Sequence, residues 1–267
     1  GNLEISLNSI DTLRGLTVVD SVGGDLTISS GNTVQDFPVV NRFHFLGGKI
    51  ALSGIDSLRD LSLLQNLDSI YDDLSISSCR QFNSFSGLPQ FAHWGGGLNL
   101  SSLTGLPNLH ELNFLKSLDG NLTISGCHNF SDLSGLDSLT RINGKLRLYS
   151  NNNLVSLEGI HNIDPQSFKT QYTFEKAVDI QQNKKLTGCA LENICQALRV
   201  YRKSYAIIGN GPGCESVVES NCVDYGLSGV VYFDRNQNKQ QDTLEFGIPR
   251  IPVLVEPGGE HVLTNNA

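Results

Sequence analysis

The sequence lacks the features of several protein classes. It contains no methionine, and no apolar run approaches the roughly 20 residues that are needed to cross a bilayer. Lysine and arginine are not clustered and the formal charge is −8, whereas a nucleic acid site needs grouped basic residues that displace counterions from phosphates. We therefore expect no membrane insertion within these residues and no nucleic acid partner.

What the sequence has in abundance is a repeat. Pairs of aliphatic residues recur along it, and the two members of a pair are two positions apart, as they must be to share one face of a strand. A fixed period indicates a solenoid, in which each coil buries its apolar side against its neighbours. First members of successive pairs lie 23, 24, 24, 24, 24, 24 and 32 residues apart. The pairs are Leu3/Ile5, Leu26/Ile28, Ile50/Leu52, Leu74/Ile76, Leu98/Leu100, Leu122/Ile124, Leu146/Leu148 and Val178/Ile180.

After each pair, apolar residues recur at every third position, which suits a tight winding path with inward side chains at its corners. We expect the pairs to form parallel strands, with a ninth strand at 205–207. A Gly or Asp before most strands fits a bend that needs permissive backbone angles. In one coil the predicted inward residues are Leu122, Ile124, Cys127, Phe130, Leu133, Leu136, Leu139 and Ile142.

The phrases Gly120-Asn-Leu-Thr-Ile-Ser-Gly-Cys127 and Leu133-Ser-Gly-Leu-Asp-Ser-Leu-Thr-Arg-Ile142 resemble leucine-rich repeats, and more closely the receptor-L-domain type found in secreted surface proteins of the Bacteroidota. This resemblance covers residues 1 to about 222 and implies a mainly β fold, an LRR-like parallel β-solenoid over residues 1–186. The chain opens inside a repeat with nothing to cover the first coil, so we expect it to be an internal part of a longer protein.

Four residues of the outward strand face are candidates for a ligand surface: Arg147, Tyr149, Asp179 and Gln181. In earlier coils the same positions carry small polar residues, which make a flat hydrated face without aromatic anchors. The alternative is that the whole face is a solvated structural surface. The group Phe82, Phe85, Phe91 and Trp94 falls at inward positions, so we interpret it as core rather than as a sugar-stacking platform.

Four cysteines, Cys189, Cys195, Cys214 and Cys222, follow the last coil around a helical stretch at 190–201, and predict a disulfide-bonded cap over residues 187–222. Four cysteines allow three pairings; we favour Cys189 with Cys214 and Cys195 with Cys222. Zinc binding is the alternative, although paired Cys-x-x-Cys units are missing. Cys79 and Cys127 lie two coils apart, about 10 Å by strand spacing, which is too far for a disulfide, and predict buried thiols.

A calcium loop is the most specific chemical pattern in the chain. Oxygen-bearing side chains stand at positions 1, 3, 5, 9 and 12 of the stretch 234–245, and position 7 would offer its backbone carbonyl, as in loops that wrap a hard cation. One departure is Lys239, which stands where such loops have Gly. The candidate ligands are Asp234, Asn236, Asn238, Gln240, Asp242 and Glu245.

The flanking segments 227–233 and 248–255 are expected to be strands. Together with Glu245-Phe-Gly-Ile-Pro249 they resemble the calcium-binding B-type modules of serine-aspartate repeat adhesins. This resemblance implies that residues 223–267 are the start of a truncated β-sandwich module that binds Ca²⁺. The alternative is a polar turn that binds nothing.

The five histidines of the repeats lie at different offsets from their strands, and no phase-matched set of carboxylates, or of nucleophile and base, converges in one groove. We expect no enzymatic activity. The leading hypothesis is a secreted or cell-surface recognition and adhesion protein whose solenoid binds a protein or glycan ligand on a calcium-stiffened stalk. The alternative is an accessory, non-catalytic region of a large secreted hydrolase. A third interpretation, an animal-type receptor ectodomain, is weakened by the lack of a dense cysteine-rich module.

Overall fold

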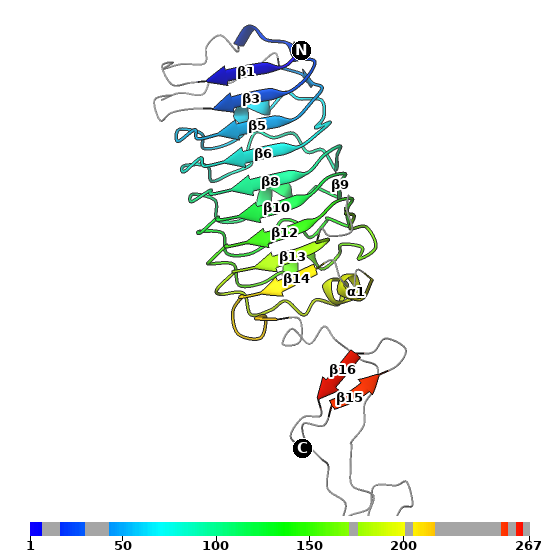
Figure 1. Cartoon of the computed structure of the whole chain (residues 1–267). Coiled ribbons are helices and arrows are strands. Elements are labelled where there is room, and N and C mark those ends of the chain that lie inside the picture. Colours follow the sequence, from blue (N-terminus) through cyan, green and yellow to red (C-terminus); the bar gives the residue numbers. More distant parts are fainter. Residues whose placement is uncertain are drawn as a thin grey trace, which may run out of the picture. The chain divides into compact units, whose positions relative to one another are not determined.

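Nine short parallel strands form the main sheet, and they stack one per coil like the rungs of a ladder (Figure 1). The computed structural model describes residues 1–6, 17–29, 43–170, 176–200, 205–216, 252–255 and 260–263. The sheet confirms the predicted solenoid, including its ninth strand. In spatial order its strands are β1 (Leu3–Ser6), β3 (Leu26–Ser29), β5 (Ile50–Ser53), β6 (Leu74–Ser77), β8 (Leu98–Ser101), β10 (Leu122–Ser125), β12 (Leu146–Tyr149), β13 (Val178–Gln181) and β14 (Tyr205–Ile208).

Neighbouring strands pair without slippage, so equivalent residues of successive coils form columns. Leu98 pairs with Leu122 and Leu122 with Leu146, while the outward residues Asn99, Thr123 and Arg147 follow one another on the opposite face. Because side chains alternate along a strand, columns of inward-facing residues alternate with columns that face water.

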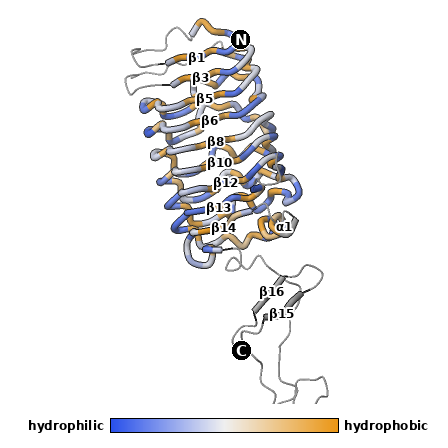
Figure 2. The backbone as a smooth tube through the Cα atoms, viewed as in Figure 1, coloured by the Kyte–Doolittle hydropathy of each residue, from blue (hydrophilic) through white to orange (hydrophobic). Residues whose placement is uncertain are grey.

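The return path of each coil carries shorter elements. A second parallel ladder consists of β7 (His93–Trp94), β9 (Ser117–Leu118) and β11 (Arg141–Ile142), and β2 (Ser21–Val22) pairs with β4 (Phe45–Leu46). The described return paths include the 3₁₀ turns η2 (Ser62–Leu64), η3 (His110–Leu112) and η4 (Glu158–Ile160). Figure 2 shows that hydrophilic residues recur at the turns on both sides of the main strands.

Each of η2, η3 and η4 is anchored by a side-chain oxygen two residues before its first residue. Oδ1 of Asp60 accepts from the N–H of Ser62 at 2.9 Å, Oδ1 of Asn108 from His110 at 3.1 Å, and Oγ of Ser156 from Glu158 at 3.1 Å. Such local bonds satisfy backbone donors that a short turn leaves open, and they explain why Asp, Asn or Ser recurs there.

The apolar residues form one continuous core. Every inward residue predicted for the coil from Leu122 is buried, as are Phe82 and Phe85, whose rings meet edge to face at 5.3 Å between centroids. Trp94 is buried and Phe91 is partly buried against the core. These four aromatic side chains therefore belong to the core, as expected. The core of each coil is completed by the neighbouring coils.

Glycines before the main strands have a different role from the one that the sequence suggested. Gly96 does not adopt a positive φ; instead, a Cβ atom there would lie 2.2 Å from the backbone carbon of Asp72 in the preceding coil. The glycine is needed because two backbones approach closely, not because of a special backbone angle. The left-handed conformation lies at the other end of the strand, where Ser78, Ser102, Ser150 and Gln182 have φ of 54–59° and Gly54, Gly126 and Gly209 of 64–69°.

A ladder of buried asparagines fills the position after this left-handed corner in the last three coils. Asn151 accepts from the N–H of Cys127 at 3.0 Å and donates to the carbonyl of Ile124 at 2.9 Å. Asn183 and Asn210 repeat both bonds one coil further on, to Asn151 and Leu148, and to Asn183 and Ile180 respectively. Each amide therefore ties its coil to the preceding one.

The cap contains the helix α1 (Glu192–Val200), which lies within the predicted stretch and contacts β13. Nδ2 of Asn193 holds the helix to the solenoid by donating to the carbonyls of Ile160 at 2.7 Å and Ile163 at 3.1 Å. A disulfide joins Cys189 to Cys214, with Cα atoms 5.8 Å apart, and confirms that pairing. Cys195 is also disulfide-bonded, and Cys222, its expected partner, lies outside the described residues.

The chain divides into two units, 1–223 and 224–267. In the second, β15 (Pro252–Val255) and β16 (Glu260–Leu263) form an antiparallel pair in which Val253 lies opposite Val262. The predicted strand at 227–233 and the calcium loop at 234–245 lie outside the described residues, so the β-sandwich and the calcium site stay predictions.

Candidate recognition surface

The four predicted surface residues lie together on β12 and β13. Arg147 is in register with Asp179 and Tyr149 with Gln181, so the two strands present a block of four outward side chains. We call these four residues the C-terminal patch. Tyr149 is 37% exposed, which places its ring among the few exposed large hydrophobic side chains of the described chain.

Arg147 is the centre of this patch. Its guanidinium lies 5.5 Å from the centroid of the Tyr149 ring, and its Nε lies 3.7 Å from Oδ2 of Asp179. Gln181 in turn donates from Nε2 to Oδ1 of Asp179. Because the Arg147 side chain is 53% exposed, the ion pair adds little stability. It does hold the largely exposed guanidinium close to an aromatic ring, an arrangement that suits a planar anionic or hydroxyl-rich ligand.

The rest of the outward face is small and polar. Ser77 donates to Ser53 at 3.0 Å and Ser125 to Ser101 at 3.2 Å, so their hydroxyls bond along the ladder. This part of the face is flat and offers hydrogen bonds but no anchor. The C-terminal patch therefore lies where the small outward side chains of earlier strands are replaced by large ones.

Ile208 extends the patch, and sequence reasoning missed it. It is in register with Gln181 on β14 and is 53% exposed. The signal was present in the alternation of the ninth strand: Ile207 pairs with the buried Ile180, so its neighbour must face outward. An exposed aliphatic side chain next to Gln181, in the same column as Tyr149, gives the patch an apolar rim.

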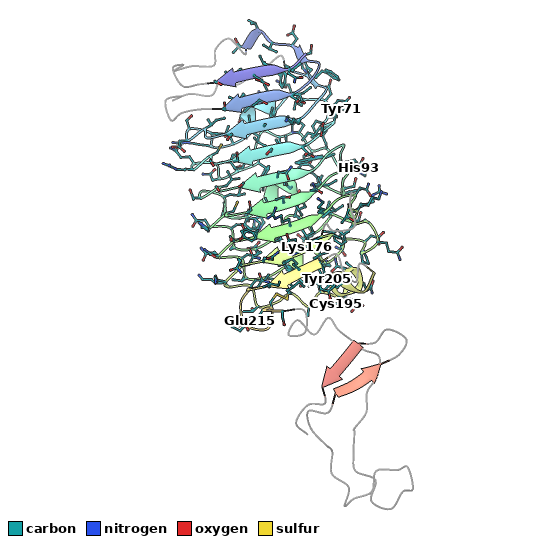
Figure 3. All side chains as sticks on the ribbon, viewed as in Figure 1. Tyr71, His93, Lys176, Cys195, Tyr205 and Glu215 are labelled. Atoms are coloured by element: carbon teal, nitrogen blue, oxygen red, sulfur yellow. A yellow bond between two sulfur atoms is a disulfide. The ribbon has the colours of Figure 1, made fainter. Side chains whose placement is uncertain are left out.

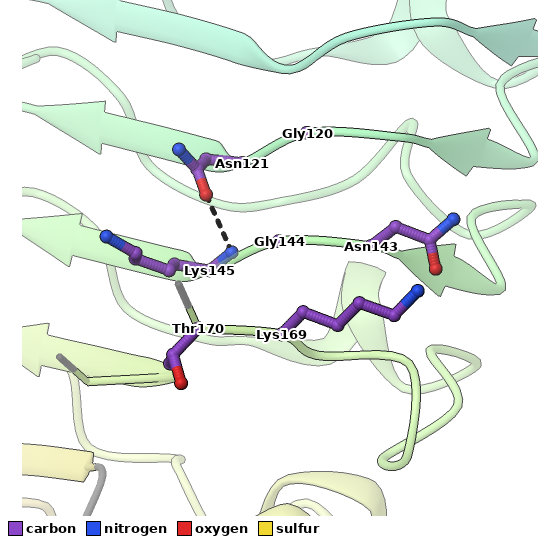
Figure 4. A pocket seen from close by; sticks show the side chains of 7 residues that line it. All are labelled: Gly120, Asn121, Asn143, Gly144, Lys145, Lys169 and Thr170. Atoms are coloured by element: carbon purple, nitrogen blue, oxygen red, sulfur yellow. Dashed lines mark hydrogen bonds between the residues drawn. The ribbon is translucent and has the colours of Figure 1, made fainter. Parts of the chain in front are cut away.

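A shallow depression of about 300 Å³ lies beside the start of β12 (Figure 4). Oδ1 of Asn121 accepts from the backbone N–H of Lys145 at 2.8 Å, and the side chain of Lys169 lies along the rim. Thr170 is the last residue before a gap in the described chain, so we assign the depression no ligand. Its lining residues are Gly120, Asn121, Asn143, Gly144, Lys145, Lys169 and Thr170.

A serine, a histidine and an aspartate meet at one turn, but in an order that does not suit catalysis. Ser134 donates its hydroxyl proton to Asp132, and its Oγ lies 2.6 Å from Nε2 of His110. Partial burial alone would raise the pKa of Asp132, yet hydrogen bonds from Ser134 and Ser131 and the nearby His110 together lower it. A carboxylate with a lowered pKa is a weak base, and because Ser134 gives its proton to Asp132, Nε2 of His110 donates to the Ser134 oxygen rather than accepting from it. The group is a turn anchor.

The described residues also bear on the predictions about free thiols, disulfides and metal binding. Cys79 and Cys127 are buried free thiols, as predicted, and burial raises the pKa of each to about 11. The bond between Cys189 and Cys214 rules out these two sulfurs as zinc ligands. In the described part of the chain, no group of three or more His, Cys, Asp or Glu side chains is placed to hold a metal ion.

The chain has no match among protein-family models, curated proteins or solved structures. Within the described residues, no helix has the length and apolar character that a bilayer-spanning segment requires. The repeat fold itself is established by the geometry, and function has to be argued from the surfaces that this fold presents.

Proposed function

We propose that this protein is a non-enzymatic extracellular or cell-surface recognition protein, whose solenoid binds a protein or glycan ligand through the C-terminal patch. The single observation that carries this proposal is the change from small to large outward side chains on the main sheet, where Arg147 lies over Tyr149 and pairs with Asp179. Arg and Tyr are enriched among residues that dominate binding energy, and here both are exposed and held in place.

The disulfides support an extracellular location. Cys189 is joined to Cys214 in the cap, and such bonds persist in oxidising compartments. The resemblance of the repeats to receptor-L-type repeats of secreted Bacteroidota proteins agrees with this location, and it favours a surface protein over the accessory region of a secreted hydrolase.

We further propose that residues 223–267 belong to a module related to the B-type modules of serine-aspartate repeat adhesins, and that its loop binds Ca²⁺ through Asp234, Asn236, Asn238, Gln240, Asp242 and Glu245. Three carboxylates beside Arg235 and Lys239 favour modest affinity, with a dissociation constant of about 10⁻⁴ to 10⁻³ M, as in other extracellular modules. Calcium would then stiffen the stalk that carries the solenoid.

Ligand binding is tested on arrays of glycans and extracellular matrix proteins with the intact chain. Arg147→Ala and Tyr149→Ala are expected to weaken the strongest array signals at least tenfold. Arg80→Ala is the matched control, because Arg80 is also largely exposed and lies 3.6 Å from Asp56 in an ion pair, in the turn after β6 and outside the C-terminal patch. Array binding that the two patch variants leave unchanged would remove the C-terminal patch from the proposal.

Calcium binding is tested by calorimetry on the intact protein. Saturable heat at millimolar calcium that Glu245→Ala weakens, and that the control Glu158→Ala leaves intact, supports the site. The absence of heat at millimolar calcium in the parent protein would refute it.

A further inference from the structure

Two exposed aromatic residues contact each other on the side of the solenoid that carries the short strands. Phe45, in β4, is 42% exposed and Tyr71 is 52% exposed. Their ring centroids are 5.6 Å apart and the ring planes are tilted by 53°. We call this pair the aromatic platform. Figure 3 shows Tyr71 and His93 along the same edge of the coils.

The repeat does not need aromatic residues at these positions. In other coils, the two columns contain only small, polar or charged residues. Since both rings remain exposed to water, they add little to the core, and their presence has no explanation in the fold. The column of Phe45 contains Ser21, Ser69, His93, Ser117 and Arg141, and the column of Tyr71 contains Gly23, Gly47, Gly95, Asp119 and Asn143.

Glycines on either side keep the rings uncovered. A Cβ atom on Gly95, one coil beyond Tyr71, would lie 2.4 Å from the carbonyl oxygen of Tyr71. A Cβ atom on Gly47 would lie 3.4 Å from Cε1 of Phe45. As glycines, these two positions put no side chain beside the aromatic platform, and both rings keep surface that is open to a ligand.

Two carboxylates and a histidine lie near the aromatic platform in sequence or in register, and the N–H of Asp68 donates to the carbonyl of His44, the residue before Phe45. Asp68 and Asp72 are exposed carboxylates close in sequence to Tyr71. His93 has its Nδ1 2.7 Å from Oγ of Ser117, and its Nε2 has no partner among the described residues. The basic residue Lys49 lies 3.9 Å from Asp25. Carboxylates repel phosphorylated or sulfated ligands, but they accept strong hydrogen bonds from hydroxyl groups.

We propose that the aromatic platform is a stacking site for a neutral, hexose-containing glycan. The C–H face of a hexose is apolar and carries slightly positive hydrogens, which meet the negative face of an aromatic ring, while its hydroxyls bond to Asp68, Asp72 and His93. A peptide would instead need apolar anchors that enter pockets, and here the rings project from the surface. This site lies on a different ladder from the C-terminal patch and does not depend on it.

The test measures binding of cellotetraose, chitotetraose and β-1,4-galactotetraose to the intact protein by saturation-transfer NMR and calorimetry. A heparin hexasaccharide and choline are the comparison ligands. The double variant Phe45→Ser, Tyr71→Asn places residues that the same columns hold in other coils, so the fold should persist, which circular dichroism checks. The variants Phe45→Leu and Tyr71→Leu keep apolar character without a ring, in case the double variant does not fold.

At least one neutral tetrasaccharide should bind, and the aromatic variants should weaken it at least tenfold. Val155→Ser, which removes another exposed apolar side chain, and Arg80→Ala, which removes an exposed ion pair outside the C-terminal patch, should change its affinity less than twofold. The site is refuted if no neutral sugar binds, if the aromatic variants bind as the parent does, or if heparin or choline is preferred. Since Arg147→Ala is read separately on the arrays, failure here is distinguishable from failure of the C-terminal patch.

Discussion

Two halves of the solenoid hold the same backbone position in different ways. After the left-handed corner, the coils that begin at Ile50, Leu74, Leu98 and Leu122 bury Ile55, Cys79, Leu103 and Cys127. The coils that begin at Leu146, Val178 and Tyr205 bury Asn151, Asn183 and Asn210 instead. Strand register is the same in both halves, so apolar packing and amide hydrogen bonds are interchangeable solutions at one position.

The two solutions differ in what they tolerate. An apolar side chain at the position after the left-handed corner packs without any directional requirement. A buried amide is stable there only when its donors and acceptors are all paired. In the asparagine half, each amide bonds to backbone groups of the preceding coil. This half also ends in the disulfide-bonded cap. It should therefore be the more sensitive of the two to single changes.

The largest expected effect is that of Asn183→Ala. This change leaves the N–H of Asn151 and the carbonyl of Leu148 buried without their partner, and should lower the free energy of unfolding by about 4 kcal/mol. Urea denaturation of the purified protein measures it. Cys127→Ala in the apolar half is the control and should lower it by about 1 kcal/mol. Equal losses in the two variants would mean that the asparagine ladder has no special role.

Loss of the cap disulfide should have the next largest effect. Cys189 and Cys214 are 25 residues apart in sequence, and closing a loop of this size stabilises the native state by about 3 kcal/mol in the chain-entropy model. The variant with Cys189→Ala and Cys214→Ala should unfold at correspondingly lower urea. Cys79→Ala, which breaks no disulfide, should respond to reducing agent as the parent does. The expectation would be contradicted if reducing agent left the stability of the parent protein unchanged.

The buried thiols of the apolar half predict a dependence on alkaline pH. Burial raises the pKa of Cys79 and Cys127 from 9.0 to about 11, so the folded state favours the protonated thiols. Their contribution to stability is fully present below pH 9 and is lost as the pH rises toward 11. Urea denaturation at pH 8 and pH 10 measures this loss, and replacing both residues with alanine should reduce it. Rapid alkylation of either thiol in the native protein at pH 8 would show that the sites are not closed.

The smallest effect on stability should come from the outward face. Arg147→Ala removes a largely exposed ion pair and should change the free energy of unfolding by less than about 0.5 kcal/mol. Arg80→Ala, in the matching pair with Asp56, should behave in the same way, so only ligand binding separates the two. A loss of several kcal/mol at Arg147 would make the C-terminal patch a structural feature rather than a recognition surface.

Part of the candidate surface could be read from spacing alone. The period and the alternation within each pair place Arg147, Tyr149, Asp179 and Gln181 on neighbouring outward columns, and the sheet confirms these columns. Spacing did not reveal that Arg147 would lie over Tyr149 while pairing with Asp179, since several rotamers are open to a long exposed side chain. The aromatic platform was missed for a related reason, because Phe45 and Tyr71 come from different columns and meet only after two coils stack.

The sequence by itself determined the period of the solenoid, the inward residues of each coil, the helix of the cap and the burial of Cys79 and Cys127, because each depends on local alternation repeated at a fixed interval. Only the tertiary structure decided the asparagine ladder, the close backbone approach that requires Gly96 and the contact of Phe45 with Tyr71. These features depend on contacts between adjacent coils, in which the two contacting residues are about one period apart in the sequence. They therefore arise only when the coils are stacked.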